Sequence, residues 1–336
     1  MKSWRFHEFG SIGNLRLEDI PVPAPSPEEC QVQMEYAALN PGDRLLVMGR
    51  YPTAARPPFS VGRDGCGRIA APDAAGRFRS GERVVFLRST VGIERDGTLA
   101  EFATVPAAHL ARIPDWWSPE DGAAGPHVLL TAWQALHDAA GLKPGETVVI
   151  SGASGGIGTA AMILAKAMGA TVIALSRSPE KRARLLELGA DHALESGGGD
   201  LAGRVHALGG ADVVVDSVGG DFLPQALEMA NPYARICVIG ALGGTKSVID
   251  PTRLIFKRLQ VHGILVALYS DEGVQEAWHS VQGVIRRTQA RIPIDSVFPF
   301  GDVLQAFERL RRGPMGKVVI GPIGNDLILV TAKTDK

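Results

Sequence analysis

One short segment near the middle of the chain constrains the fold more than any other. The apolar run Val148-Val149-Ile150 leads directly into the glycine-rich turn Ser151-Gly152-Ala153-Ser154-Gly155-Gly156. After the turn, apolar residues recur at helical spacing until Gly169, where the helix is expected to end. A buried strand, a glycine turn and a helix in this order are typical of parallel α/β folds.

The glycines of this turn are spaced as in the fingerprint of dinucleotide-binding Rossmann folds, with Ala153 in the first glycine position. Gly155 would let the backbone approach a pyrophosphate, and Gly158 would let the helix pack closely on the strand. The start of the helix would supply unpaired amides and partial positive charge to the phosphates. The segment therefore predicts a dinucleotide site.

The same turn also fits a different class of enzyme. Gly152-Ala153-Ser154-Gly155-Gly156 matches the nucleophile elbow of α/β-hydrolases, with Ser154 as nucleophile. His262 or His279 could then serve as the later histidine of a triad. A hydrolase does not need the basic end Ser176-Arg177 of the next strand, so the dinucleotide interpretation is favoured.

Alternation of apolar runs and helical periods predicts the extent of the Rossmann domain. Further strands are expected at 171–175, 211–215, 236–239 and 261–266. Near-continuous apolar strands separated by helices indicate a doubly wound parallel sheet, here over residues 126–266. Ser178 and Pro179 are expected to begin the helix after the second strand as N-cap and first helical residue.

The rest of the chain predicts a second domain around the first. Residues 1–125 are rich in Pro, Gly and short β-branched runs, which favours a bent, mostly antiparallel β domain. Residues 267–336 are expected to return to it. Helices are predicted at 271–289 and 302–312, and strands at 294–298 and 317–320. The tail after Pro322 is given no role.

The second Rossmann strand ends in residues that distinguish the two nicotinamide coenzymes. An acidic side chain there would bind the ribose 2′-hydroxyl of NAD, whereas a cation accommodates the 2′-phosphate of NADP. This chain has Ser176-Arg177-Ser178 and Lys181, with no carboxylate before Glu180. The guanidinium fork matches phosphate geometry, so NADPH is the predicted coenzyme.

Composition excludes several partners and places the chain in a reducing environment. Lys and Arg total 35 against 36 for Asp and Glu, a net charge of −1, which gives no reason to expect nucleic acid or an anionic membrane. Cys30, Cys66 and Cys237 are odd in number and far apart, which argues against a disulfide framework. No apolar run approaches the roughly 18 residues of a membrane span. A cytoplasmic location is expected.

The chain resembles the medium-chain dehydrogenase/reductase superfamily, within it the zinc-free quinone oxidoreductase and enoyl reductase branch. The resemblance covers nearly the whole chain and implies a Rossmann domain inserted into a β-rich, GroES-like catalytic domain. Its carriers include Asn40-Pro41-Gly42-Asp43, Gly49-Arg50-Tyr51-Pro52, Gly62-Arg63-Asp64-Gly65-Cys66-Gly67, Gly97-Thr98-Leu99-Ala100-Glu101-Phe102, Leu130-Thr131-Ala132-Trp133, Ser154-Gly155-Gly156-Ile157-Gly158 and Gly316-Lys317-Val318-Val319.

The resemblance also implies roles for individual residues. Around the nicotinamide and its ribose it implies Asn40, Thr131, Lys317 and the backbone of Ile239, Ile264 and Val266. At the pyrophosphate it implies Gly155, Gly156 and Ile157, and at the 2′-phosphate Ser176, Arg177 and Lys181. Ser196 stands where relatives often have a tyrosine beside that phosphate.

Zinc chemistry is disfavoured by the residues at matching positions. Zinc-dependent relatives have Cys where this chain has Gly42-Asp43 and His where it has Arg63. Zinc requires thiolate, imidazole or carboxylate ligands, and these positions do not supply a set. No metal site is predicted. Asp64 is expected to order the nearby loop or to pair with a cation.

Tyr51 is the candidate catalytic residue, since a phenol can donate a proton without bringing charge into an apolar pocket. It could equally serve only to pack over the substrate. The predicted activity is NADPH-dependent reduction of a quinone, an enone or an enoyl thioester by direct hydride transfer. A regulatory protein that binds NADPH without turnover is the non-enzymatic alternative. Relatives pair through the last Rossmann strand, so a homodimer is expected.

Overall fold

The computed structural model describes residues 1–53, 56–88 and 90–324. Contacts divide the chain into two compact units, which we call the catalytic unit and the Rossmann unit. The catalytic unit comprises Met1–His127, Tyr269–Trp278 and the segment that begins at Ile294. The Rossmann unit comprises Val128–Leu268 and His279–Pro293, so the second half of helix α9 (Asp271–Thr288) belongs to it, although the sequence had assigned 267–336 to the other unit.

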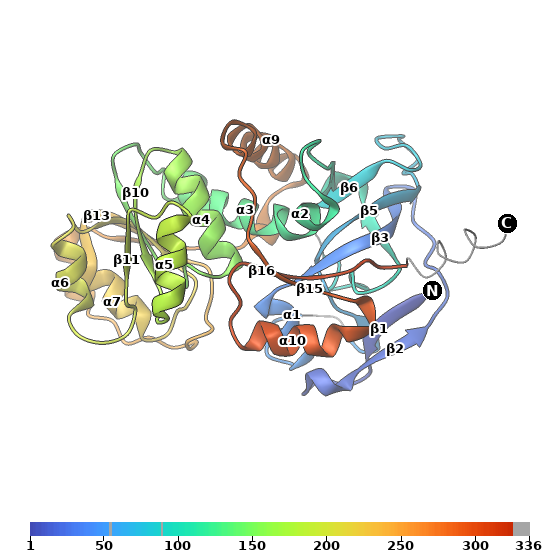
Figure 1. The fold of residues 1–336 in the computed structure, drawn as a ribbon, viewed down its shortest axis with the longest axis horizontal. Helices are drawn as coiled ribbons and strands as arrows, with labels where there is room; N and C mark the ends of the chain where they lie inside the picture. The colour runs from blue at the N-terminus through green and yellow to red at the C-terminus, as the bar shows by residue number, and fades with distance from the viewer. Residues whose placement is uncertain (54–55, 89, 325–336) are drawn as a thin grey trace, which may run out of the picture. The chain divides into compact units, whose positions relative to one another are not determined.

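The Rossmann unit is built on a six-stranded parallel sheet in the order β11-β10-β9-β12-β13-β14. Its strands are β9 (Thr147–Ile150), β10 (Thr171–Leu175), β11 (His192–Leu194), β12 (Ala211–Asp216), β13 (Ala230–Val238) and β14 (Gln260–Gly263). Its helices are α3 (Pro126–Trp133), of which Pro126 and His127 belong to the catalytic unit, α4 (Gly156–Ala167), α5 (Pro179–Glu187), α6 (Leu201–His206), α7 (Phe222–Met229) and α8 (Pro251–Lys257). The strand order reverses direction at β9, the arrangement of doubly wound folds (Figure 1).

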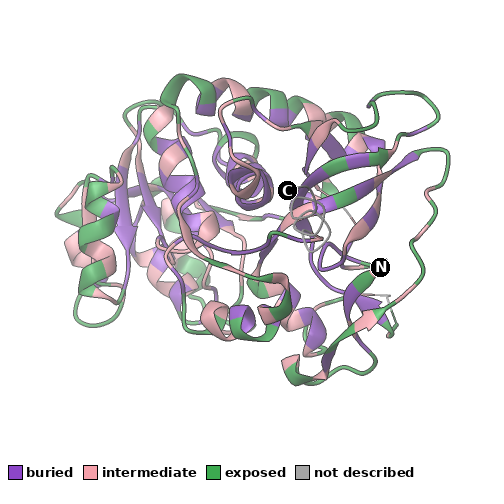
Figure 2. Ribbon diagram, turned by 45° about the vertical axis from the view of Figure 1, so that its right-hand side comes forward, coloured by how far each residue is buried: buried purple, intermediate pink, exposed green. Residues whose placement is uncertain are grey.

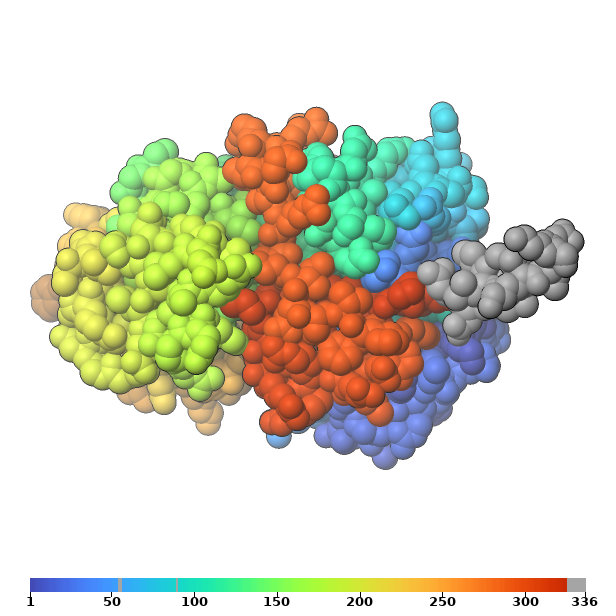
Figure 3. Space-filling model, viewed as in Figure 1, coloured from blue at the N-terminus to red at the C-terminus, as the bar shows by residue number. Residues whose placement is uncertain are grey.

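Burial explains why these segments form a covered sheet. Val148, Val149 and Ile150 of β9 are all fully buried, as expected for a central strand with helices on both faces. Figure 2 shows this sheet largely in purple, whereas the helices at its rim turn exposed residues outward. Helices α5 and α6 form much of the yellow-green surface of this unit in Figure 3.

The predicted elements of the Rossmann unit are present, but two strands differ clearly from their expected bounds. The strand expected over 236–239 is β13, which begins earlier, at Ala230, and ends at Val238. Ser178 caps α5 by accepting from the Lys181 N–H, and Pro179 is the first helical residue. The strand expected over 261–266 was wrong beyond Gly263, since β14 ends there. Its partner β13 ends at Val238, so only the Ile264 N–H still pairs, and Val266–Leu268 turns into a 3-10 helix.

The catalytic unit is β-rich and, apart from the parallel β15–β16 pair, antiparallel, as predicted. A seven-stranded sheet runs β15-β16-β3-β5-β6-β8, with β7 also on β3, and a three-stranded sheet runs β2-β1-β4. The bounds are β1 (Lys2–Phe6), β2 (Leu15–Asp19), β3 (Glu29–Leu39), β4 (Phe59–Ser60), β5 (Asp64–Ala71), β6 (Arg83–Phe86), β7 (Phe102–Pro106), β8 (Leu110–Arg112), β15 (Ile294–Phe298), β16 (Lys317–Ile320), α1 (Pro41–Val47), α2 (Pro119–Ala124) and α10 (Val303–Arg311).

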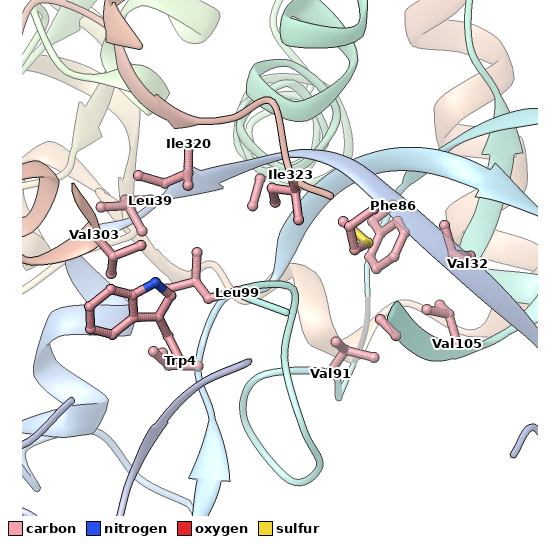
Figure 4. Close-up of a cluster of buried hydrophobic side chains, with 14 of the residues drawn as sticks. Trp4, Val32, Leu39, Phe86, Val91, Leu99, Val105, Val303, Ile320 and Ile323 are labelled. Carbon is pink, nitrogen blue, oxygen red and sulfur yellow. The ribbon is translucent and has the colours of Figure 1, made fainter. Parts of the chain in front are cut away.

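One hydrophobic core joins the two sheets of the catalytic unit and α10. Trp4, Leu39, Leu99, Val303 and Ile320 come from segments far apart in sequence and lie close together in Figure 4. The Trp4 indole also donates to the Phe300 carbonyl at 2.7 Å, so its polar end is satisfied. In the part of the chain that the structure describes, no helix is long and apolar enough to cross a membrane.

Candidate functional site

The glycine turn leaves the first amides of α4 without side-chain partners. The Gly155 N–H donates to the Gly152 carbonyl at 2.9 Å, which closes the turn. Gly155 is then the N-cap of α4, with φ −81° and ψ 175°, and offers no side chain to the helix. The initial N–H groups of a helix have no intrahelical acceptor, so a phosphate can take that place.

The two key glycines of the turn have different surroundings. A Cβ on Gly158 would lie 2.4 Å from the Gly152 carbonyl oxygen and 2.5 Å from the Ala153 Cα, so only glycine lets the helix approach the turn. A Cβ on Gly155 would meet only the Gly152 oxygen, at 3.5 Å. The space beside Gly155 is therefore open to a ligand, and the cradle fits a pyrophosphate.

A residue that the sequence analysis missed fixes the neighbouring loop. Asp216, at the end of β12, is fully buried. Its Oδ1 accepts from the Ser151 hydroxyl and from the amides of Val218 and Gly219, each at 2.9 Å. This carboxylate ties the glycine turn to the loop after β12. An aspartate that ends an apolar strand was the signal that could have identified it.

The predicted 2′-phosphate residues lie together at the carboxyl end of β10. Ser176 is buried, Arg177 is exposed and Lys181 lies in the first turn of α5. Arg182, which was not predicted, donates from Nη1 to the carbonyls of Ser176 and Arg177 at 3.0 and 3.1 Å. These bonds fix the backbone that carries Arg177.

The remaining predicted site residues of the Rossmann unit lie on different elements. The Ile239 N–H donates to the Asp216 carbonyl at 2.8 Å, so Ile239 lies at the same sheet edge as the glycine turn. Ile264 follows β14, and Val266 begins the 3-10 helix. Thr131 lies in α3 and is 4% exposed.

In the catalytic unit, Asn40 and Lys317 meet although they are far apart in the sequence. Lys317 Nζ donates to Asn40 Oδ1 at 2.7 Å and to Asp64 Oδ2 at 2.6 Å. The expected pairing of Asp64 with a cation is thus confirmed. Because an ammonium can only donate, the amide oxygen of Asn40 must face Lys317. Asn40 Nδ2 is a buried donor with no acceptor at normal hydrogen-bond geometry among the described residues, although it lies near enough to Asp64 to lower the pKa of that carboxyl.

The ionisation of this cluster follows from burial and from neighbouring charges. Burial alone would raise the pKa of Asp64, but the Lys317 ammonium and the hydrogen bonds of Lys317 and Asn40 together outweigh burial and hold this pKa below its usual value. Burial lowers the pKa of His127 to about 4, although Asp64 lies 3.6 Å from its Nδ1. Asp64 and Lys317 therefore form an ion pair beside a neutral imidazole at pH 7.

Tyr51 lies beside a second buried ion pair. Arg63 Nε donates to Asp43 Oδ1 at 3.0 Å, and Arg63 Nη1 donates to the Tyr51 hydroxyl at 3.3 Å. Burial would lower the pKa of Arg63, yet Asp43 and Tyr51 together raise it above its usual value, so the guanidinium stays charged. Sequence reasoning named Arg63 only as a departure from zinc enzymes and did not predict this pair.

Two family models match the chain in consecutive parts. The alcohol dehydrogenase GroES-like domain matches residues 26–115, and the zinc-binding dehydrogenase model matches residues 156–283. The first match lies within the catalytic unit, and the second covers most of the Rossmann unit together with Tyr269–Trp278 of the catalytic unit. They leave no role for a hydrolase built on Ser154, and that alternative is wrong.

Individual relatives and solved structures agree with the family models. Quinone oxidoreductase of Rattus norvegicus is 28% identical over 327 residues, covering 95% of this chain and 97% of that protein. A stretch of erythronolide synthase EryA2 of Saccharopolyspora erythraea is 35% identical over 344 residues, covering 97% of this chain but 9% of the synthase.

Among solved structures, the quinone oxidoreductase of Thermus thermophilus, also determined with NADPH, is similar with a TM-score of 0.80 and 32% identity. That similarity covers 95% of this chain and 99% of the other. The glycine turn before α4, the match to a GroES-like domain and similarity over 95% of the chain all lead to one family. The chain belongs to the medium-chain dehydrogenase/reductase superfamily, in the branch of the quinone oxidoreductases, and is an NAD(P)-dependent oxidoreductase.

Proposed function

We propose that this oxidoreductase reduces a quinone or an α,β-unsaturated carbonyl, enoyl thioesters included, by direct hydride transfer from NADPH and without zinc. The observation that carries the proposal is the uncapped start of α4, with open space beside Gly155 and none beside Gly158. The similarity to quinone oxidoreductases favours a quinone, and the similarity to a polyketide synthase segment favours reduction of a C=C bond.

The preference for NADPH rests on charge at the end of β10. Arg177 is exposed, its backbone is held by Arg182, and Lys181 follows one turn later. Glu180 is the first carboxylate after the strand, and it accepts from the Ser178 hydroxyl at 2.5 Å. A 2′-phosphate would thus meet two cations, while the Glu180 carboxylate is held by the Ser178 hydroxyl.

Independence from zinc is supported by the charged side chains that stand at and beside the positions where zinc-dependent relatives have their metal ligands. Asp43 and Asp64 are buried, and each is paired with a buried cation, Arg63 and Lys317 respectively. A zinc ion there would lie among two positive charges and would have to displace them from their carboxylates. The described residues contain no group of three or more His, Cys, Asp or Glu side chains that could hold a metal.

The residues of the chain can be given steps in the reaction. Bound NADPH supplies the hydride, which goes to the β-carbon of the substrate or to the quinone. Asn40, with its oxygen fixed by Lys317, presents Nδ2 to a ribose hydroxyl of the coenzyme. Tyr51 donates its phenolic proton to the carbon or oxygen on which negative charge develops. Water then returns a proton to the phenolate.

Turnover with a substrate panel tests the function. NADPH oxidation should be measured with enals, enoyl thioesters and quinones, with product identified in each case. We expect reduction of at least one class in the presence of a strong chelator. NADPH binding without turnover of any class would instead indicate a regulatory protein.

Coenzyme choice is tested separately by Arg177→Ala. We expect the Kd for NADPH to rise at least tenfold, because a charge-assisted bond to the 2′-phosphate is lost, while the Kd for NADH changes little. Calorimetric titration with both coenzymes measures this. Arg184→Ala, which removes an exposed cation further along α5, is the matched control. Equal losses for NADPH and NADH in Arg177→Ala would remove the argument.

A further inference from the structure

Arg63 is a buried charged side chain whose position is not explained by a contribution to the stability of the fold. It stands just before β5, is 8% exposed, and its guanidinium is buried. Burying a charge is costly unless it is paired and fully hydrogen bonded. Arg63 Nη2 is buried and has no acceptor in the described part of the chain. A group left partly unsatisfied in a core calls for an explanation other than stability.

One side of the guanidinium is fixed by α1. Asp43, in the first turn of that helix, accepts from Arg63 Nε through Oδ1 and from the Asn40 N–H through Oδ2, at 2.7 Å for the latter. A Cβ on Gly42 would lie 3.0 Å from Arg63 Nη2. A larger side chain at position 42 would therefore crowd the guanidinium, which packs against the bare backbone there.

The other side of the guanidinium faces Tyr51. The Arg63 Cζ lies 4.8 Å from the centre of the Tyr51 ring, and Nη1 donates to the phenolic oxygen. A guanidinium has donors only, so the oxygen of Tyr51 must accept. Its own O–H must then point away from Arg63. Tyr51 is only half-buried, so this proton can be reached from outside the core.

We propose that Arg63, held by Asp43, is a positioning residue that orients the Tyr51 phenol so that its proton is the one offered to the substrate. The inference rests on the proposed function, in which Tyr51 is the proton donor. When the O–H bond breaks, its electron pair stays on the phenolic oxygen, beside the guanidinium cation. The proton goes to the substrate carbon or oxygen, and Arg63 itself neither gives nor takes one, since its charge is permanent.

Among the described residues, the hydrogen bonds that lead away from the Tyr51 hydroxyl do not provide a proton route. The hydroxyl is bonded to Arg63 Nη1, and Arg63 is bonded in turn to Asp43. A guanidinium does not titrate in the accessible range, so it passes no proton to the phenol. The cluster therefore acts on Tyr51 through orientation and charge, and reprotonation comes from water.

A double-mutant cycle tests the proposal. One change is Arg63→Gln together with Asp43→Asn, so that neither buried charge is left alone; the other is Tyr51→Phe. We expect each change to lower kcat by ten- to a hundredfold for the best substrate of the panel, with the KM for NADPH unchanged. Combined, they should be no worse than Tyr51→Phe alone, because Arg63 acts through the phenol. Circular dichroism and thermal unfolding confirm that each variant is folded.

Arg63→Lys is a second variant that retains a buried cation able only to donate. We expect Arg63→Lys to recover part of the kcat that is lost when Arg63→Gln and Asp43→Asn are combined. If the Arg63 and Asp43 changes cost the same factor with and without Tyr51, their role is structural and the inference is overturned, while the proposed donor stands. If Tyr51→Phe leaves kcat unchanged, the donor role in the proposed function fails and the inference fails with it.

Discussion

His127 should make the stability of the protein depend on pH in the mildly acidic range. Its pKa is lowered to about 4 in the folded chain, against 6.5 for a free side chain, because burial disfavours the charged ring. The charged groups that face it are Asp64, which favours protonation, and Arg63 and Lys317, which oppose it. Between pH 6.5 and 4 the unfolded chain therefore binds the proton more tightly, and stability falls as pH falls.

His127→Asn should remove this component. We expect the wild-type free energy of unfolding to drop between pH 7 and 5 by roughly 2 kcal/mol more than that of the variant. Urea titrations at both pH values measure the difference. His279→Asn changes an exposed histidine on α9 and should follow the wild type. A His127 variant with the wild-type pH dependence would contradict the burial argument.

At the scale of elements, the two glycines of the turn are expected to serve different purposes: Gly155 is needed for coenzyme binding, and Gly158 is needed for the packing of α4. Gly155→Ala places a methyl in open space at backbone angles that alanine readily adopts. We expect stability to change by no more than about 0.5 kcal/mol, because the unfolded chain loses freedom while alanine is a poorer N-cap than glycine. The same methyl would lie where the pyrophosphate approaches, so the Kd for NADPH should rise at least tenfold.

Gly158→Ala should reduce the stability of the protein, whereas Gly155→Ala should mainly reduce its affinity for NADPH. Its methyl would overlap the Gly152 carbonyl oxygen and the Ala153 Cα, so α4 would have to move away from the turn. We expect a loss of about 1–3 kcal/mol of unfolding free energy, as for other overpacked sites. Gly197→Ala, in an open loop, is the control for both measurements. Equal stability of the Gly155 and Gly158 variants would show that close packing at the turn is not required.

The elements themselves were largely predictable because their signals are local. β10, β15 and β16 have the bounds expected from apolar runs, and α5 begins at its predicted cap. The length of the strand expected over 261–266 was overestimated, because an apolar run in the sequence does not show where the neighbouring strand β13 ends. The short α6 was not predicted, since six residues give too little periodicity to be distinguished from a loop.

The candidate site was predictable only where one segment carries it. The glycine turn and the end of β10 each lie within a few consecutive residues, so their patterns could be recognised. The pairing of Lys317 with Asn40 and Asp64, and of Arg63 with Asp43 and Tyr51, depends on how the sheet and α1 bring distant segments together. No spacing rule connects those residues, and only the fold brings them together.

At the scale of the whole molecule, the Rossmann sheet ends in an edge strand that invites a partner. β14 is the last strand of the sheet, and its burial pattern is mostly exposed. Val261 is 45% exposed, and the apolar side chains of Ile255, Phe256 and Leu268 are also exposed nearby in the sequence. Soluble proteins seldom leave such an edge uncovered. We expect a second copy to pair with it around a two-fold axis, so that the sheet continues into the partner.

Val261→Lys tests this homodimer, because a charge on an edge strand opposes pairing. Light scattering should show the wild type at twice the chain mass of 35.6 kDa and the variant at that mass itself. Leu186→Lys alters a comparably exposed apolar residue on α5, away from the edge, and should remain a dimer. A dimer that survives Val261→Lys but is lost in Leu186→Lys would move the interface to the α5 face, and a monomeric wild type would mean that the edge is stable uncovered.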